Sequence, residues 1–338
     1  MSSTVFFLFL RGFGKLEEWQ LNLRAESEIS LFYEKKQTLV TGASGFVGSY
    51  LLPALELQGE SKIHCFEGDI RDRNTVSNQL KEIQPDILIH LAAQAFVPIA
   101  IENPWETEEI NVGGTLNLLE SLHRLQRPCK MLYISSADVY GKQNLSQLPL
   151  KESFLPNPVN PYAGSKLAAE SYCRQYAHYS PFVSVVIARP FNHIGIGQRK
   201  EFVIPNFCSQ IIEAKHSGKS FIAVGDLEPT RDFSHVEDII SGYLTLIEKG
   251  ESGEIYNICS GEERSIRYMV EELVKFSGHE IKFEVDVGRV RASETSKVYG
   301  DNSKLKALGW ENKHSLSETL SQIYNHLESE FLKSKQTD

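Results

Sequence analysis

Residues 37–48 read Gln-Thr-Leu-Val-Thr-Gly-Ala-Ser-Gly-Phe-Val-Gly, and this stretch decides the fold class of the chain. The short apolar run Gln37–Thr41 predicts a strand, and the apolar residues of Phe46–Leu57 recur at helical spacing. Between the two runs, glycines stand at every third position. The stretch therefore predicts a strand, a tight turn and a helix.

The three glycines suit a turn that holds a dinucleotide. Gly42 permits the sharp bend, Gly45 lets the backbone approach a pyrophosphate, and Gly48 lets the helix pack close to the sheet. The N-terminus of the helix adds N–H donors and a positive dipole. A purely structural glycine turn is the alternative. Because the strand, turn and helix follow in the required order, we predict cofactor contacts at Gly42, Ser44, Gly45, Phe46, Val47 and Gly48.

Strands and helices alternate through the first half of the chain. Further strands are expected at Ile63–Phe66, Ile87–Leu91, Met131–Ser135 and Val183–Ala188, and helices at Thr75–Ile83, Thr107–Leu125 and Pro161–His178. This order predicts right-handed crossovers and a parallel sheet, and hence an α/β fold with a Rossmann-type doubly wound sheet.

Beyond Pro190 the alternation gives way to glycine-containing loops. Apolar or helical stretches remain at Val203–Ile212, Phe221–Val224, Val236–Ile247, Ile255–Ile258, Ile266–Phe276 and Leu316–Phe331. We predict a Rossmann domain over residues 37–190, to which some later segments return, and a smaller C-terminal substrate-binding domain over residues 191–332. Residues 1–36 are expected to be an N-terminal extension outside the fold.

Composition limits the classes of function. The 338 residues are 41% hydrophobic and carry a formal net charge of −9. That hydrophobic content excludes a disordered chain, and the negative charge argues against nucleic acid or a membrane surface as a partner. Five cysteines without metal-ligand spacing predict neither a disulfide framework nor a metal site, and they favour a reducing cytoplasm. The apolar run Val5–Leu10 is too short to span a membrane, which takes about 20 residues.

Two further segments are expected beside the dinucleotide. Asp69 and Ile70 follow the strand Ile63–Phe66, which we interpret as the third strand, with the second strand and its helix shortened. On that interpretation Asp69 binds the adenine edge, and the preference between NAD and NADP stays open. Small residues also end the next strand, as needed where a cofactor crosses strand ends, although close helix packing is the alternative. The cofactor contacts expected there are Leu91, Ala92 and Ala93.

The pattern that best indicates chemistry is Tyr162-Ala163-Gly164-Ser165-Lys166 in a helix, with Ser136 at the end of the preceding core strand. Tyr162 and Lys166 are four residues apart and therefore share one helix face. A phenol has an ordinary pKa of about 10, and we expect the adjacent ammonium to lower the pKa of Tyr162. Tyr162 then exchanges a proton with a substrate oxygen while a nicotinamide transfers a hydride. Ser136 is expected to hydrogen-bond the same oxygen.

With these motifs the chain resembles the extended short-chain dehydrogenase/reductase family, the NAD-dependent epimerase/dehydratase family, over residues 37–330. Motifs of the second half, together with two that precede them, make it most similar to the reductases that act on GDP-linked 4-keto-6-deoxyhexoses. The motifs are Ile134–Gly141, Asn160–Ala163, Ala188–Gly195, Gly197–Gln198, Val224–Asp226, Thr230–Phe233 and Tyr256–Gly261.

The resemblance implies NAD(P)H-dependent reduction of a C4 ketone to GDP-6-deoxy-D-mannose (GDP-rhamnose), for surface polysaccharide synthesis. It also implies a nucleotide-sugar-binding C-terminal domain, a cofactor contact at Phe191, and a homodimer formed through the helices that carry Asn111 and Tyr162. Ile196 and Ala292 stand where the family has proline, which loosens both loops. For Arg231 and Arg291, which the resemblance places at the substrate, the alternative role is that of a solvated surface charge. The implied substrate-binding residues are Ser136, Asn192, Arg231, Arg291 and Glu294.

The fold alone does not decide the reaction, because the same family contains dehydratases and epimerases. A 4,6-dehydratase needs a carboxylate base and an acid beside the catalytic serine, and here the next residues are Ala137 and Asp138. Ala137 carries no acid. Asp138 is one methylene shorter than the glutamate of dehydratases, and it equally suits a cap on the following turn. We therefore expect a reductase. The alternatives are a GDP-mannose 4,6-dehydratase or another nucleotide-sugar epimerase/dehydratase and, least favoured, a non-catalytic dinucleotide-binding protein.

Overall fold

The computed structural model describes residues 36–59, 62–143, 146, 148–286, 288 and 297–336. The predicted extension over residues 1–36 lies outside these residues, except for Lys36 itself. Within the described ranges, none of the helices is long and apolar enough to cross a membrane.

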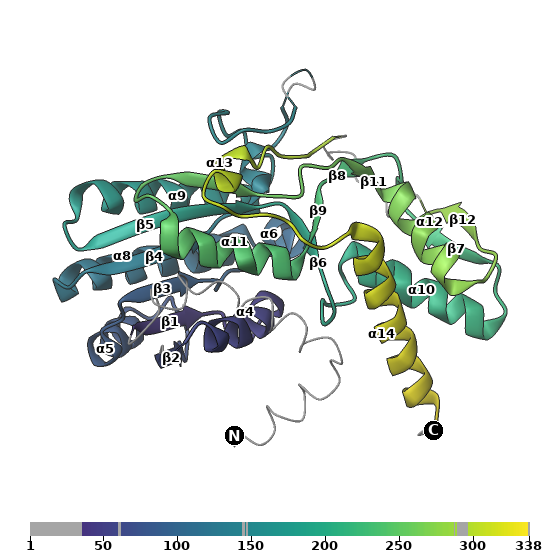
Figure 1. Cartoon of the computed structure of the whole chain (residues 1–338), viewed down its shortest axis with the longest axis horizontal. Coiled ribbons are helices and arrows are strands. Elements are labelled where there is room, and N and C mark those ends of the chain that lie inside the picture. Colours follow the sequence, from purple (N-terminus) through teal and green to yellow (C-terminus); the bar gives the residue numbers. More distant parts are fainter. Residues whose placement is uncertain are drawn as a thin grey trace.

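A six-stranded parallel sheet with the strand order β10-β5-β4-β3-β1-β2 forms the centre of the molecule (Figure 1). All five pairings between these strands are parallel. The strands are β1 (Gln37–Thr41), β2 (Lys62–Cys65), β3 (Ile87–His90), β4 (Cys129–Ile134), β5 (Val183–Pro190) and β10 (Ile255–Ile258). The predicted α/β Rossmann-type sheet is confirmed. In such sheets, ligands bind at the carboxyl ends of the strands.

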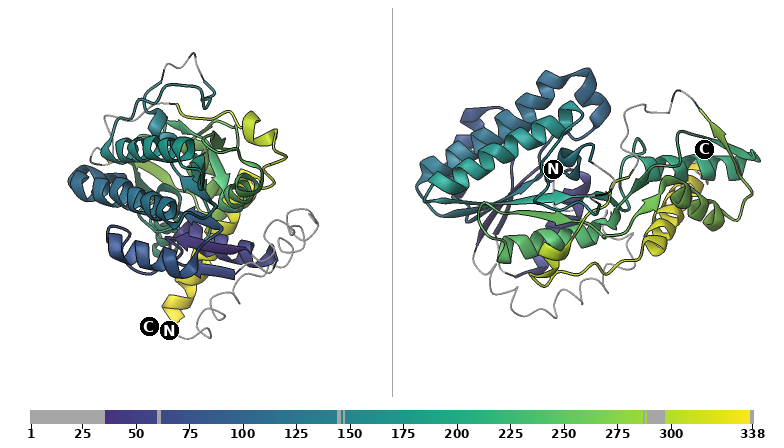
Figure 2. Two further views of the ribbon diagram at one scale, coloured as in Figure 1. Left: turned by 90° about the vertical axis from the view of Figure 1, so that its left-hand side faces the viewer. Right: turned by 90° about the horizontal axis from the view of Figure 1, so that it is seen from above.

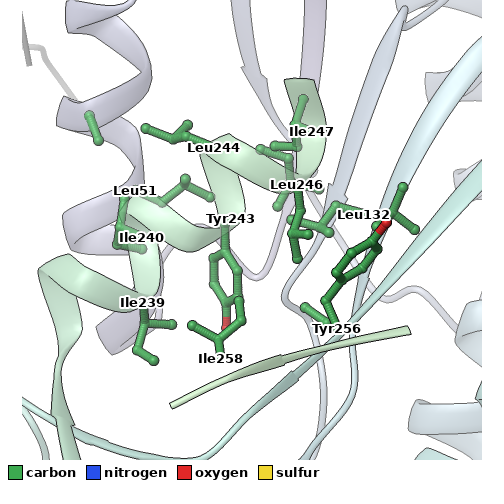
Figure 3. Packing of buried hydrophobic residues seen from close by; sticks show 14 of the residues in the cluster. Leu51, Leu132, Ile239, Ile240, Tyr243, Leu244, Leu246, Ile247, Tyr256 and Ile258 are labelled. Atoms are coloured by element: carbon green, nitrogen blue, oxygen red, sulfur yellow. The ribbon is translucent and has the colours of Figure 1, made fainter. Parts of the chain in front are cut away.

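Helices cover both faces of the sheet (Figure 2). On one face lie α5 (Arg73–Ile83), α8 (Gly114–Leu125) and α9 (Pro161–Tyr179), and on the other lie α4 (Phe46–Leu57) and α11 (Val236–Lys249). Figure 3 shows the core on the second face, where Tyr243 and Leu246 of α11 pack with Tyr256 of β10. Burying both faces explains why the strands read as continuous apolar runs rather than as alternating ones.

A separate hydrophobic core holds the remaining elements together. It joins α10 (Val203–Ser217), β7 (Phe221–Val224), α12 (Ile266–Ser277), β12 (Lys282–Val285) and α14 (Leu316–Gln336). Short strand pairs complete this half: β6 (Asn192–Ile194) with β9 (Phe233–His235), and β8 (Thr230–Arg231) with β11 (Arg264–Ser265). The short helix α13 (Ser303–Lys306) packs back against β10.

Two expected elements differ from the structure. The strand before Asp69 is the second in chain order and pairs directly with β1, so its interpretation as a third strand is wrong. The helix expected over Thr107–Leu125 is three pieces: α7 (Pro104–Glu108), a π-helical turn (Glu109–Gly113) and α8, with α6 (Val97–Glu102) before them. The π-helical turn coincides with tertiary hydrogen bonds of Asn111, which donates to the Gln94 carbonyl at 3.0 Å and to Ser165 Oγ at 2.9 Å.

Candidate active site

The glycine turn after β1 has the shape that its sequence predicts. Gly42 has φ of +70°, and a Cβ there would lie 2.6 Å from the Ala92 nitrogen. A Cβ on Gly48 would lie 2.2 Å from the Ala43 carbonyl oxygen. Gly45 is the N-cap of α4 and offers no side-chain cap, so the first N–H groups of the helix have no side-chain acceptor from the cap residue.

The loop after β3 lies directly against this turn. Leu91 N donates to the Thr41 carbonyl at 3.2 Å, and Ala92 N donates to Thr41 Oγ1 at 3.2 Å. Ser44 and Gly45 remain exposed at this edge of the sheet. An exposed glycine-containing turn, an uncapped helix N-terminus and a small-residue loop together fit the pyrophosphate of a dinucleotide.

The two residues expected near adenine behave differently. Asp69 is exposed and accepts hydrogen bonds from Arg71 Nε at 2.8 Å and Nη2 at 2.6 Å, and these bonds hold the pKa of Asp69 below its ordinary value. Ile70 is buried, and a Cβ on Gly114 would meet its Cδ1 at 2.4 Å. The Ile70 side chain therefore packs against α8, which leaves only its backbone for a cofactor contact.

The three residues expected to carry the chemistry come together where β4 ends and α9 begins. Tyr162 hydrogen-bonds Ser136, and Ser136 is the N-cap of the 3₁₀ turn Ala137–Tyr140. One turn along α9 from Tyr162, Lys166 Nζ donates to the Ile134 carbonyl oxygen at 2.8 Å. The phenol, the hydroxyl and the ammonium thus converge from two elements.

The predicted lowering of the Tyr162 pKa is wrong for this structure. Burial raises the pKa of Tyr162 above its ordinary value, the Asp138 carboxylate raises it further, and the hydrogen bond with Ser136 opposes the shift only in part. The Lys166 ammonium is directed at Ile134, and its own pKa is lowered to about 8 by burial. Tyr162 is therefore a neutral phenol, the form that donates a proton.

The residues implied for the substrate lie beyond β5, in the second half of the chain. Asn192 is exposed on β6, opposite Phe233 of β9. Arg231 is half-buried on β8, and its Nη1 donates to the Thr230 carbonyl at 2.8 Å. The Phe191 side chain is buried, and its ring centroid lies 6.4 Å from that of Tyr140. Arg291 and Glu294 lie outside the described residues.

Sequence reasoning missed a buried ion pair behind this centre. Glu170 of α9 and Arg189 of β5 are each only 2% exposed, and their Oε2 and Nη2 atoms are 2.7 Å apart. Two signals were present in the sequence. Glu170 stands four residues after Lys166 on the same helix face, and Arg189 interrupts an apolar strand, where a charge requires a partner.

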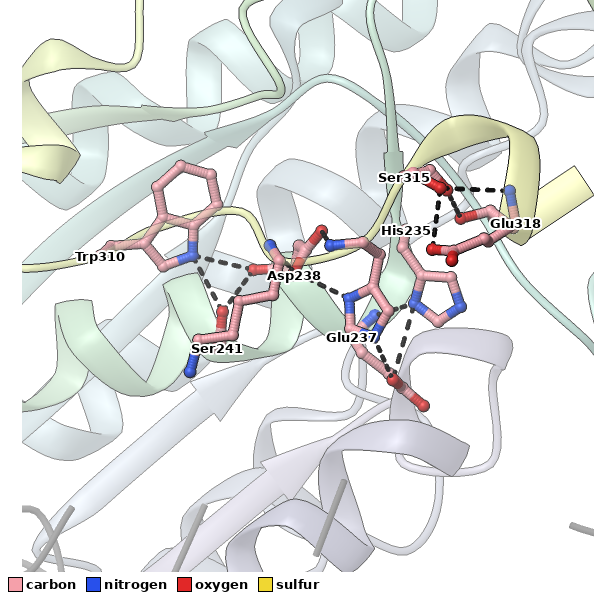
Figure 4. Close-up of polar contacts among 10 residues, drawn as sticks. His235, Glu237, Asp238, Ser241, Trp310, Ser315 and Glu318 are labelled. Carbon is pink, nitrogen blue, oxygen red and sulfur yellow. Dashed lines mark hydrogen bonds and ion pairs between the residues drawn. The ribbon is translucent and has the colours of Figure 1, made fainter. Parts of the chain in front are cut away.

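One group in the described part of the chain has the spacing of metal ligands: His235, Glu237 and His314. Figure 4 labels two of these residues, His235 and Glu237. The ring nitrogens of His314 contact carboxylates, with Nδ1 2.9 Å from Asp238 Oδ1 and Nε2 3.0 Å from Glu237 Oε2. His235 Nδ1 accepts from the Glu237 N–H at 3.0 Å. These contacts with carboxylates favour a proton on the His314 ring.

The sheet, the glycine turn and the Ser-Tyr-Lys set define a short-chain dehydrogenase/reductase. A model of the GDP-mannose 4,6 dehydratase family matches residues 54–323, and the chain belongs to that family. It is 39% identical to the GDP-6-deoxy-D-mannose reductase of Pseudomonas aeruginosa over 87% of this chain and 98% of that protein. It is 33% identical to the GDP-6-deoxy-D-talose 4-dehydrogenase of Aggregatibacter actinomycetemcomitans over 79% and 89%.

Solved structures agree with this assignment. The structure of RMD from Pseudomonas aeruginosa complexed with NADPH superimposes with a TM-score of 0.79, at 39% identity over 87% of this chain and 99% of that one. A UDP-glucose 4-epimerase from Thermotoga maritima with UDP-glucose gives a TM-score of 0.80 at 25% identity, over 87% and 99%. The predicted family, the extended short-chain dehydrogenases/reductases, is confirmed.

Proposed function

We propose that the protein reduces the C4 ketone of a GDP-linked 4-keto-6-deoxyhexose with NAD(P)H, which yields GDP-6-deoxy-D-mannose. One observation carries the proposal: the buried, neutral Tyr162 phenol is hydrogen-bonded to Ser136 at the carboxyl end of β4. Reduction of a ketone needs a proton donor at the carbonyl oxygen, and a neutral phenol is that donor. The reduced nicotinamide supplies the hydride.

Each residue has one role in this reaction. Ser136 and Tyr162 bind the ketone oxygen, and Tyr162 donates the proton that converts the developing alkoxide to a hydroxyl. Lys166 keeps a positive charge near the phenol and stabilises the tyrosinate that remains. Asn192 and Arg231 bind the diphosphate and sugar of the substrate, for which arginine offers paired donors to phosphate oxygens. The similarity to the GDP-6-deoxy-D-mannose reductase supports a GDP-linked 4-keto sugar as the substrate.

Dehydration is less well supported by the same centre. Ala137 is buried and has no ionisable group, so no acid stands directly after Ser136. Asp138 is exposed in the 3₁₀ turn, and its N–H donates to Ser136 Oγ at 3.1 Å. A second candidate product follows from the similarity to the GDP-6-deoxy-D-talose 4-dehydrogenase: hydride delivery to the opposite face of C4 would give the talose epimer.

We further propose a homodimer in a reducing cytoplasm. All five cysteines are free thiols, and four of them are buried.

Next to α9, the short helices α6 and α7 expose apolar side chains, with Ile101 62% and Trp105 79% exposed. Apolar surface of this kind is typical of an interface. Light scattering of the purified protein tests the dimer, and Trp105→Glu should shift it toward the monomer.

The function is tested by supplying GDP-mannose with and without a separate 4,6-dehydratase, adding NADH or NADPH, and identifying the sugar by NMR. We expect cofactor oxidation only when the dehydratase is present, with GDP-6-deoxy-D-mannose as product. Formation of the 4-keto sugar by this protein alone, without net cofactor use, would replace the reductase by the dehydratase. The sugar spectrum separates the mannose product from its talose epimer, and the two cofactor arms measure the preference between NADH and NADPH.

A further inference from the structure

A buried polar network lies immediately behind the reacting groups. Glu170 follows Tyr162 by eight residues and Lys166 by four on α9, so all three side chains lie along one face of the helix. Its carboxylate accepts from Arg189 Nε at 2.9 Å and from Arg189 Nη2 at 2.7 Å. The same carboxylate accepts a short hydrogen bond from Ser135 Oγ. Glu170 of α9 is therefore hydrogen-bonded to Ser135, which directly follows β4, and to Arg189 near the end of β5.

Ser135 directly precedes Ser136, and this makes the contact relevant to the chemistry. The Ser135 N–H donates to the Ala188 carbonyl at 2.8 Å, and its hydroxyl reaches Glu170. Both bonds fix the backbone from which the Ser136 hydroxyl extends. The distance between Ser136 Oγ and the Tyr162 hydroxyl thus depends on how Glu170 holds α9 against the end of β4.

Arg189 extends the network toward the turn after Ser136. Its guanidinium carbon lies 4.6 Å from the centroid of the Tyr140 ring, and Tyr140 ends the 3₁₀ turn that Ser136 caps. The Tyr140 hydroxyl donates to Asn257 Oδ1 at 2.6 Å, and Asn257 of β10 pairs in register with Arg189. Arg189 therefore contacts both Glu170 and the last residue of this 3₁₀ turn.

A buried ion pair is weak evidence for a gain in stability. The cost of removing two charges from water can exceed their attraction, and well-packed apolar replacements often leave stability unchanged or increase it. In this protein, the pair contacts Ser135, which directly precedes Ser136, and Tyr140, which ends the turn that Ser136 caps. The arrangement therefore favours a role in the geometry of the reacting groups.

We infer that Glu170 and Arg189 are positioning residues for the reduction: together they set the separation of Ser136 from Tyr162. This inference rests on the proposed function, because the geometry that the pair maintains is that of the proposed reduction. Misplacing a reacting group by about 1 Å costs about 10²-fold in rate. Loss of the pair should therefore lower kcat far more than it changes binding of cofactor or sugar.

The pKa of Lys166 offers a measurement that should not change if the ion pair only stabilised the fold. The titratable groups around it are Glu170 and Cys173 of α9, Tyr133 of β4 and His90 of β3. Burial lowers the pKa of Lys166 to about 8, while Cys173 and Glu170 oppose that shift. Removing the Glu170 carboxylate should lower the pKa of Lys166 further and move the alkaline fall of kcat to lower pH.

The test is an apolar triple variant, Glu170→Leu/Arg189→Met/Ser135→Ala, which removes both charges and the hydroxyl bonded to them. We expect its melting temperature and its affinity for NADPH to stay near wild type, its kcat to fall about 10²-fold, and its alkaline limb to shift. If the triple variant keeps both the melting temperature and the kcat of the wild type, the ion pair has no role in positioning the reacting groups, and the inference is overturned. Glu328→Gln is the matched control, because it breaks the ion pair between Lys215 and Glu328 in the second half of the chain.

Ser135→Ala decides the matter if the triple variant does not fold. It deletes one hydrogen bond to Glu170 and keeps the ion pair, so kcat should fall several-fold at temperatures well below its melting transition, where the variant is fully folded; an unchanged kcat contradicts the inference. If the wild type reduces no GDP-linked ketone, the proposed function fails. The inference is then judged by the pH dependence of the Lys166 Cε chemical shift in wild type and Glu170→Gln, where coincident titrations would overturn it.

Discussion

The rings of His314 and His235 stack with centroids 4.3 Å apart and an interplanar angle of 23°, yet the two histidines have opposite pKa shifts. Burial alone would lower the pKa of His314, but hydrogen bonds with Asp238 and Glu237 raise it to about 9. Burial lowers the pKa of His235 to about 4. A protonated ring therefore lies on a neutral one, and the charged ring links the segment before α14 to the first turn of α11.

This contact predicts a loss of stability at alkaline pH. The folded pKa of His314, about 9, lies above the ordinary value of 6.5. The stabilisation is therefore fully present below pH 6.5, declines between the two values, and is lost above pH 9. We expect His314→Gln to lower the free energy of unfolding by about 2 kcal/mol near neutral pH and by little at pH 10. Urea unfolding across this pH range measures the free energy of unfolding of the wild type and the variant. The exposed His178→Gln is the control.

Zinc gives an independent test of the same group. Although His235, Glu237 and His314 have metal-ligand spacing, both nitrogens of His314 already contact carboxylates. An added divalent ion would have to displace a proton held with a raised pKa. We expect equimolar zinc to leave the melting temperature unchanged at pH 7. A rise that EDTA reverses and that His314→Gln abolishes would instead identify a metal site.

Tyr162→Phe should remove proton donation and keep cofactor binding. General acid catalysis contributes typically 10²–10⁴-fold, so we expect kcat to fall by about that factor. NADPH affinity, measured by fluorescence titration, should change little. The control is Tyr243→Phe, because Tyr243 is also buried and its hydroxyl has no hydrogen-bond partner among the residues that the structure describes. Ketone reduction at nearly the wild-type rate by Tyr162→Phe would contradict the proton-donor role.

Arg231→Ala should weaken sugar-nucleotide binding selectively. A charge-assisted hydrogen bond contributes about 1.5–3 kcal/mol, which corresponds to an increase of about 10- to 100-fold in KM for the sugar nucleotide. The dissociation constant for NADPH should remain at its wild-type value. Arg267→Ala serves as control, since Arg267 is an exposed arginine paired with Glu228. Equal loss of cofactor and substrate binding would show that Arg231 is structural.

Local sequence patterns correctly predicted the strand and helix on either side of the glycine turn, because the signals for these elements are short-ranged. The strand Gln37–Thr41 and the helix Phe46–Leu57 have the expected bounds, since periodicity and the glycine spacing lie within a few residues of each other. The helix expected from Thr107 begins at Pro104 and contains a π-helical turn at Glu109–Gly113, in which Asn111 bonds to residues 17 and 54 positions away. Patterns within one segment do not record such partners.

The electrostatics of the site were the least predictable part. Spacing correctly brought Tyr162 and Lys166 to one helix face, but the sign of the Tyr162 pKa shift depends on burial and on Asp138, which only the folded chain determines. The ion pair of Glu170 with Arg189 likewise joins residues 19 positions apart on a helix and a strand. In both cases the missing information was how deeply each group is buried.

A pair of glycine substitutions separates close packing from mere helix propensity. At Gly48, a Cβ would lie 2.2 Å from the Ala43 carbonyl oxygen, and the backbone there has no room to move because α4 packs on the sheet that contains β1. We expect Gly48→Ala to destabilise the protein by about 3 kcal/mol and to abolish NADPH binding, since α4 must shift away from the glycine turn. At Gly113, which is helical, a Cβ meets nothing within 4 Å. Gly113→Ala should therefore raise stability by about 0.5–1 kcal/mol. Thermal unfolding and NADPH titration of the two variants measure both effects, and similar values for the two would refute the close contact between the turn and the first turn of α4.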